Sequence, residues 1–299
     1  MRLPLLAAST ALVLAAFAGN SLLVRLALAD RLLSPEAFTL IRLVSGAAVL
    51  AMLITAGRGS RNLWRAGRWS GGAALFGYAA LFSWAYLDLD AGTGALVLFA
   101  AVQLSMIGWG LARGERLHGL AALGPPLAGA GLLWLLLPGS ARPDPLAALA
   151  MTGAGLCWGV YSLLGRGRND ATLATAGNFL RASLIAVPVV SALVWASQGT
   201  AIPATASGIL VACLCGGLTS GLGYALWYRV LPHLTATRAG VVQLAVPPLA
   251  ALGGLAFLSE PPTLRLFAAS ALILVGIGLS LRRHPQSRPR NSAPPRLFR

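Results

Sequence analysis

Long apolar stretches separated by short polar turns follow one another along almost the whole chain. A helix needs about 20 mostly apolar residues to span the hydrocarbon core of a bilayer. Stretches that approach this length predict helices at approximately 4–24, 36–56, 71–89, 92–112, 119–138, 146–165, 172–196, 207–231, 236–258 and 263–281. The first stretch also resembles a secretory signal, but a near-copy of it later in the chain favours a helix that is retained. The pattern therefore predicts an all-α membrane protein with ten transmembrane helices.

Parts of the first and sixth stretches have almost the same sequence. Residues 17–25 read FAGNSLLVR and residues 158–166 read WGVYSLLGR. Further matches keep the same order, at offsets between 139 and 146 residues: Arg42 with Arg181, Gly77 with Gly223, Glu115 with Glu260, and Gly131 with Gly276. The sequence therefore predicts two five-helix repeats, at 1–142 and 143–283, followed by a disordered basic cytoplasmic tail at 284–299. Since five is odd, the second repeat is inverted, which is typical of secondary transporters.

Arginine alone sets the predicted orientation, because the chain contains no lysine. With a cytoplasmic N-terminus, 17 arginines lie on the inside: Arg2, Arg58, Arg61, Arg65, Arg68, Arg113, Arg116, Arg166, Arg168, Arg229, Arg238, Arg282, Arg283, Arg288, Arg290, Arg296 and Arg299. Four lie on the outside: Arg25, Arg31, Arg142 and Arg265. Arg42 and Arg181 then lie within spans. Because cytoplasmic loops carry the excess of basic residues, we predict that both termini are cytoplasmic.

The composition argues against a soluble protein. The chain is 57% hydrophobic and only 10% charged, whereas soluble domains have about 25% charged residues. The net charge of +15 does not indicate nucleic-acid binding, because the arginines lie between apolar runs and in the tail. The three cysteines lie in apolar runs without histidine, which favours buried free thiols over a metal site or disulfides. We therefore expect no metal and no other cofactor, and no obligate protein partner is evident.

The positions of the acidic residues bear on the energy source. All eight fall at or near predicted helix ends, and none lies at mid-membrane depth, where a proton relay would need one. No Walker sequence is present, so ATP is not predicted to drive transport. Acids, histidines and metal ligands also do not converge at one depth, which argues against a membrane-embedded enzyme. The sequence favours facilitated diffusion, with coupling of a charged substrate to the membrane potential as the alternative.

Several motifs resemble the EamA family of the drug/metabolite transporter (DMT) superfamily. They are the aromatic-led first and sixth spans, FTLIRLVSG at the head of the second, the turns RGERL and LSEPP, and Pro247-Pro248 in the ninth. The fourth span has Val102-Gln103 where the family has proline, which predicts a straighter helix there. The resemblance covers Leu3 to Arg283 and implies a multi-pass protein of the bacterial inner membrane. It implies an exporter of small amino acids or related metabolites working by alternating access; the alternative is a carrier of another small metabolite or drug, with or without proton coupling.

The resemblance also implies a central cavity lined by the first, third, fourth, sixth, eighth and ninth spans. Spacings of three or four residues place aromatic and amide side chains on shared helix faces. The predicted substrate-binding residues are Phe17, Asn20, Tyr78, Phe82, Phe99, Gln103, Trp158, Tyr161, Tyr224, Trp227 and Gln243. Such a cup suits a small zwitterion, because aromatic faces attract an ammonium group and amides or phenols bond a carboxylate. Plain packing, or hydrogen bonds between helices, is the alternative for these side chains.

Two arginines and a pair of prolines lie within predicted spans. Arg42 is about two turns into its helix, from where it can snorkel to the outer surface. Arg181 lies deeper, where it would hold a substrate carboxylate or brace its helix through backbone carbonyls. The resemblance favours the brace, because it places the second and seventh spans outside the cavity. Pro247 and Pro248 remove helix hydrogen bonds in the ninth span, so we predict a hinge there.

Overall fold

The computed structural model describes residues 3–58, 63–112, 119–136, 143–165, 170–196, 204–234, 239, 242–261 and 263–280. Within these residues the regular structure is helical, apart from one isolated β-bridge between Leu33 and Ala204. Several residues used in the sequence predictions lie outside the described residues: Arg2, Arg61, Arg113, Glu115, Arg116, Arg142, Arg166, Arg168, Arg238 and everything from position 281 onward.

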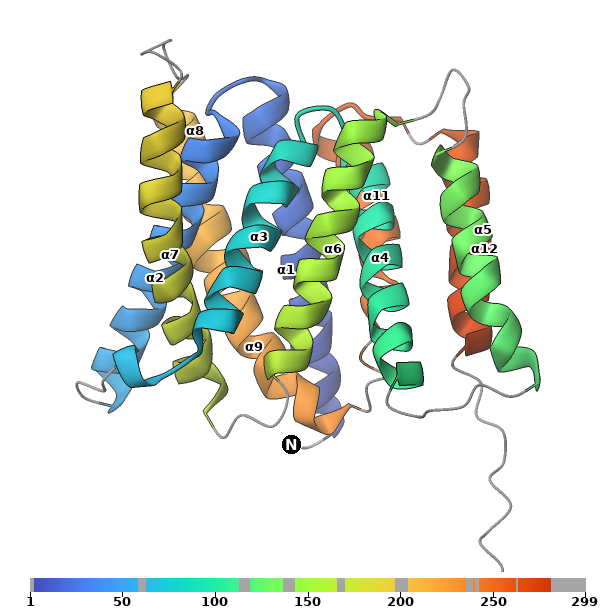
Figure 1. The fold of residues 1–299 in the computed structure, drawn as a ribbon, viewed down its shortest axis with the longest axis horizontal. Helices are drawn as coiled ribbons and strands as arrows, with labels where there is room; N and C mark the ends of the chain where they lie inside the picture. Colours follow the sequence, from blue (N-terminus) through green and yellow to red (C-terminus); the bar gives the residue numbers. More distant parts are fainter. Residues whose placement is uncertain are drawn as a thin grey trace, which may run out of the picture.

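Every predicted stretch overlaps a described helix (Figure 1). The α-helices are α1 (Leu3–Ala29), α2 (Pro35–Arg58), α3 (Trp69–Ala85), α4 (Ala91–Ala112), α5 (Gly124–Leu136), α6 (Pro145–Gly165), α7 (Ala171–Ala196), α8 (Ala206–Leu214), α9 (Gly223–Val230), α11 (Val246–Phe257) and α12 (Leu264–Ser280). The shorter elements are η1 (Leu63–Arg65), η2 (Gly119–Leu123), η3 (Cys215–Leu222) and η4 (Leu231–His233).

The surfaces of these helices are those of a membrane protein. Six helical segments of the described chain are long and apolar enough to cross a bilayer, and α11 and α12 are shorter apolar helices. Large apolar side chains stay exposed around the bundle, among them Leu133, Leu149, Trp195, Leu210 and Leu252, each more than half exposed. In water such a surface would aggregate, whereas lipid tails accommodate it and the helices satisfy their own backbone hydrogen bonds. The prediction of an all-α membrane protein is confirmed.

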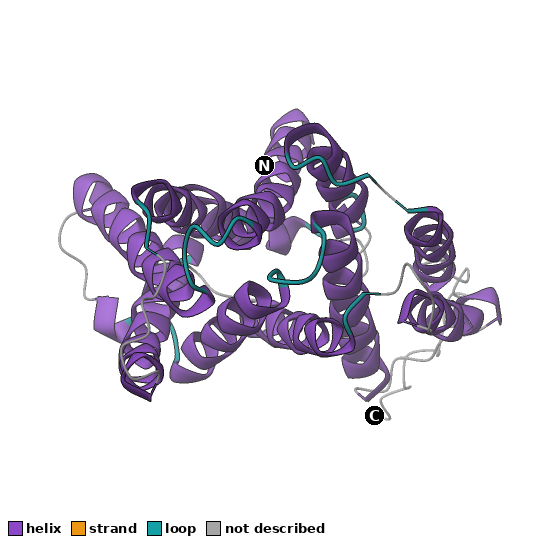
Figure 2. Ribbon diagram, turned by 90° about the horizontal axis from the view of Figure 1, so that it is seen from above, coloured by secondary structure: helices purple, strands orange, loops and turns teal. Residues whose placement is uncertain are grey.

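Several of the main helix contacts have a counterpart in the other half of the chain. α1 packs against α9 and α11, while α6, in the other half, packs against α3 and α4. α2 packs against α7, α4 against α11 and α5 against α12. In Figure 1 the pair α5 and α12 stands at one end of the bundle, and Figure 2 shows the helices from above. The centre of the bundle is therefore formed by α1, α3, α4, α6, α9 and α11.

The predicted eighth span departs from a regular helix. α8 runs into the π-helical segment η3 and then into α9 without a break. A Cβ atom added at Gly216 in η3 would collide with the backbone oxygen of Arg42 and the hydroxyl of Ser45. The glycine therefore allows the π-helical segment to approach the backbone of α2 closely, and this approach is stabilised by dense packing. The sequence predicts a helix here but does not reveal its π-helical turn.

The predicted ninth span is interrupted. The chain turns at residues 244–245, and α11 begins at Val246. Pro247 and Pro248 lie in the first turn of α11, where a helix does not need their missing N–H groups. The break therefore precedes the prolines instead of falling at a bend within a continuous helix. Whether the chain moves at this point stays a prediction.

Candidate substrate site

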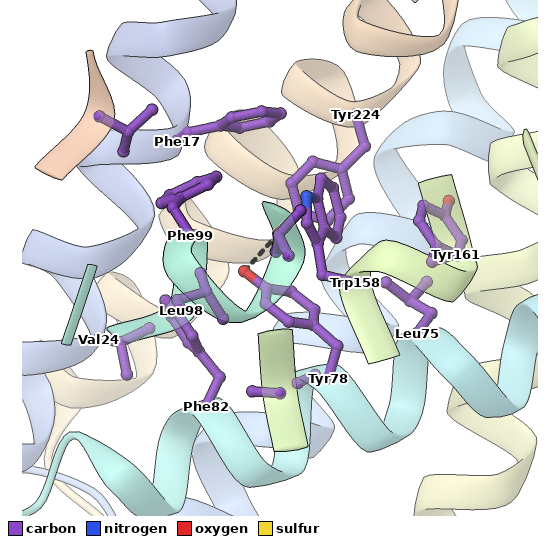
Figure 3. Packing of buried hydrophobic residues seen from close by; sticks show 14 of the residues in the cluster. Phe17, Val24, Leu75, Tyr78, Phe82, Leu98, Phe99, Trp158, Tyr161 and Tyr224 are labelled. Atoms are coloured by element: carbon purple, nitrogen blue, oxygen red, sulfur yellow. Dashed lines mark hydrogen bonds between the residues drawn. The ribbon is translucent and has the colours of Figure 1, made fainter. Parts of the chain in front are cut away.

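One phenylalanine lies at the centre of an aromatic cluster in the middle of the bundle. Phe17 of α1 meets Trp158 of α6 edge-on, with the ring centroids 5.5 Å apart. It also meets Tyr224 and Trp227 of α9 edge-on, at 5.9 and 5.6 Å, and stacks on Phe99 of α4 at 6.4 Å. Figure 3 shows Phe17, Phe99, Trp158 and Tyr224 converging from separate helices. Edge-on and stacked contacts at such distances are favourable for aromatic rings.

Tyr78 of α3 completes the cluster from the opposite side. Its ring centroid lies 5.0 Å from that of Trp158 and 5.1 Å from that of Phe82. Trp158 is also 4.6 Å from Tyr224, and Tyr161 stacks on the indole of Trp158 at 5.5 Å. Trp158 is thus enclosed by aromatic rings from α1, α3, α6 and α9.

These side chains enclose a small cavity. Its lining residues are Phe17, Asn20, Ser21, Tyr78, Phe82, Leu98, Phe99, Trp158 and Tyr224. The space open to the centre of a water molecule is about 10 Å³, which is room for about one water. An amino acid is several times larger, so binding one requires the walls to move apart. Seven of the predicted substrate-binding residues line this cavity; their role in binding stays a prediction.

The four other predicted residues lie outside the cavity lining. Trp227 packs behind Phe17, and Tyr161 packs behind Trp158. Gln243 accepts a hydrogen bond from the indole N–H of Trp158 at 3.2 Å, so it holds the orientation of that ring. Gln103 is buried, and its amide nitrogen has no hydrogen-bond partner among the described residues.

A polar network lies against one wall of the cavity. The Oδ1 atom of Asn20 accepts hydrogen bonds from the hydroxyls of Thr219 and Ser220 at 2.7 and 2.9 Å. Its amide nitrogen donates to the Tyr224 hydroxyl at 3.2 Å, and that hydroxyl donates to the Tyr78 hydroxyl at 3.1 Å. Thr219 and Ser220 belong to the π-helical segment η3. Residues of η3 therefore support a lining residue of α1, a contribution that the sequence did not reveal.

Arg42 of α2 joins this network, which corrects the expectation that it snorkels to the outer surface. Its side chain is buried, with only 1% of the residue exposed. The guanidinium donates to the Ser220 hydroxyl at 2.9 Å, the Tyr224 hydroxyl at 2.8 Å and the Tyr78 hydroxyl at 3.2 Å. Its central carbon lies 5.2 Å from the ring centroids of Tyr78 and Phe82. Hydroxyl partners and ring faces within reach hold the side chain inside the bundle.

Arg181, which the repeat pairs with Arg42, makes a different set of contacts. It donates to the backbone oxygens of Trp64 at 2.6 Å and Gly177 at 2.9 Å, and also to that of Ala66. Its guanidinium lies over the ring of Trp69, 5.7 Å from the centroid. The predicted carbonyl brace is confirmed: Arg181 ties α7 to the segment that precedes α3.

A cluster of charged groups joins the ends of several central helices. Arg25 of α1 donates to Glu260 at 2.6 Å and to the backbone oxygens of Tyr86 and Leu87 at 3.0 and 2.9 Å. The other carboxylate oxygen of Glu260 accepts from the backbone N–H of Ala91, at the start of α4, at 2.8 Å. The turn after α11, the end of α3 and the start of α4 are thereby tied to α1. We call this cluster the Arg25 clasp.

Asp90 lies beside the Arg25 clasp. Its carboxylate is 3.7 Å from the Arg25 guanidinium. Partial burial and the neighbouring Glu260 carboxylate raise the pKa of Asp90 above its ordinary value, although Arg25 opposes the shift. The backbone of Ser259 adopts a left-handed conformation with a φ of 53°, which ends α11 and turns the chain toward Glu260.

No group of three or more histidine, cysteine or carboxylate residues in the described chain could hold a metal ion. Cys157, Cys213 and Cys215 are free, and the Cys215 thiol donates to Asn20 at 3.3 Å. The cavity is instead built from aromatic rings, hydroxyls, an amide and one arginine behind them. Such a set can bind a small organic molecule through cation–π contacts and hydrogen bonds.

Comparisons with known proteins agree with this architecture. Residues 145–282 match the EamA-like transporter family. An uncharacterised protein of Pseudomonas aeruginosa is 51% identical over 272 residues, which is 91% of this chain and 93% of the relative. The threonine/homoserine exporter RhtA of Salmonella typhimurium is 32% identical over 166 residues, about half of each chain (52% and 53%). A crystal structure of a protein with 22% sequence identity superposes with a TM-score of 0.65, covering 92% of this chain and 97% of the other. The chain therefore belongs to the EamA-like transporter family of the DMT superfamily, as a multi-pass inner-membrane transporter and not an enzyme.

Proposed function

We propose that this transporter exports small amino acids or related metabolites by alternating access. The observation that carries the proposal is the closed aromatic cavity where α1, α3, α4, α6 and α9 meet. Rings such as those of Phe17 and Trp158 offer faces to a substrate ammonium group, and the Tyr78 and Tyr224 hydroxyls offer hydrogen bonds to its polar end. The relative named as a threonine/homoserine exporter supports this substrate class.

The two-sided mechanism is supported by the packing. Several of the main helix contacts recur between the halves, as two inverted repeats over 1–142 and 143–283 would require. With the N-terminus in the cytoplasm, as the arginines predict, α1 begins inside and the Arg25 clasp faces outside. In that orientation the clasp closes the outer path to the cavity. Export then requires the clasp to open while the opposite end stays closed.

Facilitated diffusion is the mode of energy supply that we favour. Among the described residues the cavity lining contains no carboxylate and no histidine that could carry a proton. Asp90, whose pKa is raised, lies at the end of the helices beside the clasp. Proton coupling through Asp90 and Glu260 is the second candidate, because two carboxylates share that site. A pH gradient distinguishes the two modes.

Uptake by purified protein in liposomes tests the proposal. A panel of radiolabelled L-threonine, L-alanine, L-leucine and L-phenylalanine is measured with and without an imposed pH gradient. We expect saturable flux of at least one amino acid, independent of the gradient. Trp158→Ala should reduce this flux at least tenfold, because it removes the central ring of the aromatic cluster. A tenfold loss corresponds to about 1.4 kcal/mol of binding or transition-state free energy.

Trp195→Ala is the matched control, because Trp195 is 86% exposed on the outer surface of α7. It should leave the flux unchanged. Absence of flux for the whole panel would contradict the amino-acid class and direct the search to other small metabolites or drugs. Equal losses in both variants would contradict the placement of the site.

A further inference from the structure

Arg42 is a buried cation whose positive charge has no carboxylate partner in the described part of the chain. The ion pairs found there join Arg25 to Glu260 and Asp90, and neither includes Arg42. A charge inside a membrane protein is costly unless it is paired, and such charges mark substrate pathways. The position of Arg42 therefore calls for an explanation that packing alone does not give.

The guanidinium lies directly against the cavity wall. Asn20, Tyr78 and Tyr224 accept hydrogen bonds from it, and the ring of Phe82 lies under it. These are four of the nine residues that line the cavity. One guanidinium nitrogen, Nη1, is buried and has no hydrogen-bond partner among the described residues. A buried donor without a partner is rare in proteins, because leaving it unpaired forfeits the hydrogen bond that it would make in water.

The packing of η3 on α2 holds this guanidinium close to the cavity. The glycine contacts between α2 and η3 bring the Ser220 hydroxyl to 2.9 Å from Nε of Arg42. Ser220 fixes the base of the guanidinium, and the terminal nitrogen Nη2 donates to the hydroxyls of Tyr78 and Tyr224. π-helical turns such as η3 occur frequently at functional sites.

Arg181 also has one buried nitrogen, Nε, without a hydrogen-bond partner among the described residues, but both of its terminal nitrogens are bonded. It bonds three backbone carbonyls, which are fixed acceptors that cannot be released without moving the chain. Nη2 of Arg42 instead reaches side-chain groups, chiefly tyrosine hydroxyls, which can rotate and turn from acceptor to donor. Such partners can yield to an incoming anion.

We propose that Arg42, together with the Tyr78 and Tyr224 hydroxyls, binds the carboxylate of the transported molecule. This inference rests on the proposed function and specifies its substrate class as carboxylate-bearing. A guanidinium presents parallel N–H groups that match the two oxygens of a carboxylate. The aromatic rings of Phe17 and Trp158 then receive the remainder of the molecule. When the cavity opens, the substrate carboxylate accepts a hydrogen bond from Nη1 and neutralises the buried charge of Arg42.

An acid and its amide test this assignment. L-threonine and L-threoninamide, and L-phenylalanine and L-phenylalaninamide, share an ammonium group and a side chain and differ in the carboxylate. Each is measured as an unlabelled competitor of labelled amino-acid uptake in proteoliposomes. In the wild type we expect each acid to compete at a concentration roughly 100-fold lower than its amide.

The variants then locate the group responsible. Arg42→Gln should bring the acid-to-amide ratio close to one, Arg42→Lys should restore part of it, and Arg181→Gln should leave it at the wild-type value. A wild type that accepts acid and amide equally overturns the inference even if no variant folds. An Arg42→Gln variant that retains the wild-type ratio overturns it as well. A wild type that transports none of the panel overturns the proposed function, and the inference with it.

Discussion

Glu260→Gln is the most direct perturbation of the closed state. The glutamine keeps the shape of the side chain and can still accept a hydrogen bond from the N–H of Ala91, but it loses the charge that Arg25 contacts at 2.6 Å. The Arg25 and Glu260 side chains are only 15% and 13% exposed, so water screens their interaction weakly. Losing one charge-assisted hydrogen bond of this kind costs about 2 kcal/mol. Because the bond ties the closed end together, the open population should rise about 30-fold.

Thiol labelling measures this change. Ser21, which lines the cavity, is replaced by cysteine in a background in which Cys157, Cys213 and Cys215 are serine. The labelling rate of detergent-solubilised protein by a polar maleimide reports how often the cavity opens. The Glu260→Gln variant should be labelled about 30-fold faster than the same protein with Glu260 intact.

Arg265→Gln is the control, because Arg265 bonds the backbone oxygen of Trp134 in the α5–α12 pair, away from the cavity. It should leave the labelling rate unchanged. An unchanged rate in Glu260→Gln, or an equal increase in both variants, would refute the view that the Arg25 clasp holds the cavity closed.

Three further predictions concern stability. Arg181→Gln should lower the free energy of unfolding in detergent by about 3 kcal/mol, since it removes hydrogen bonds to backbone carbonyls; an unchanged denaturation midpoint would contradict the brace. Gly216→Ala should destabilise the protein by about 1–3 kcal/mol, because the added Cβ would strike α2. Gly278→Ala is the control: position 278 has open space around it, so this variant should be neutral or stabilising by up to about 1 kcal/mol. A larger loss of stability in Gly278→Ala than in Gly216→Ala would exclude close packing at η3. Asp90→Asn should raise the melting temperature at pH 7 and not at pH 3.5. The raised pKa of Asp90 means that ionisation of its carboxyl group destabilises the folded state. This loss of stability sets in as the pH rises from the ordinary pKa of 3.8 through the raised pKa, and asparagine, which cannot ionise, avoids it. A difference that is largest at low pH would contradict that sign.

Much of the fold could be predicted from the sequence, because each long helix corresponds to a local run of apolar residues. The lining aromatics were also accessible, since spacings such as that of Tyr78 and Phe82 place side chains on one helix face. The burial of Arg42 was missed. A snorkelling side chain and a buried one have the same local sequence, and only the packing of η3 on α2 decides between them.

The Arg25 clasp was missed for a related reason. Arg25 and Glu260 are 235 residues apart in the sequence, and each looks like an ordinary polar residue at a helix end. Their pairing depends on how α1 and α11 meet, which no single segment encodes. The left-handed turn at Ser259 could not be predicted either, because glycine, and not serine, usually adopts this conformation.

Counterflow tests the central claim most directly. Proteoliposomes preloaded with unlabelled L-threonine are diluted into a trace of labelled L-threonine, with no pH gradient and no membrane potential. An alternating-access carrier that works by facilitated diffusion exchanges internal unlabelled threonine for external labelled threonine. We therefore predict that label accumulates transiently inside the liposomes above its equilibrium level. Trp158→Ala should abolish this overshoot, and Trp195→Ala should retain it. Label that enters without an overshoot would indicate a channel, and accumulation that appears only with an imposed pH gradient would indicate proton coupling; either result contradicts the account.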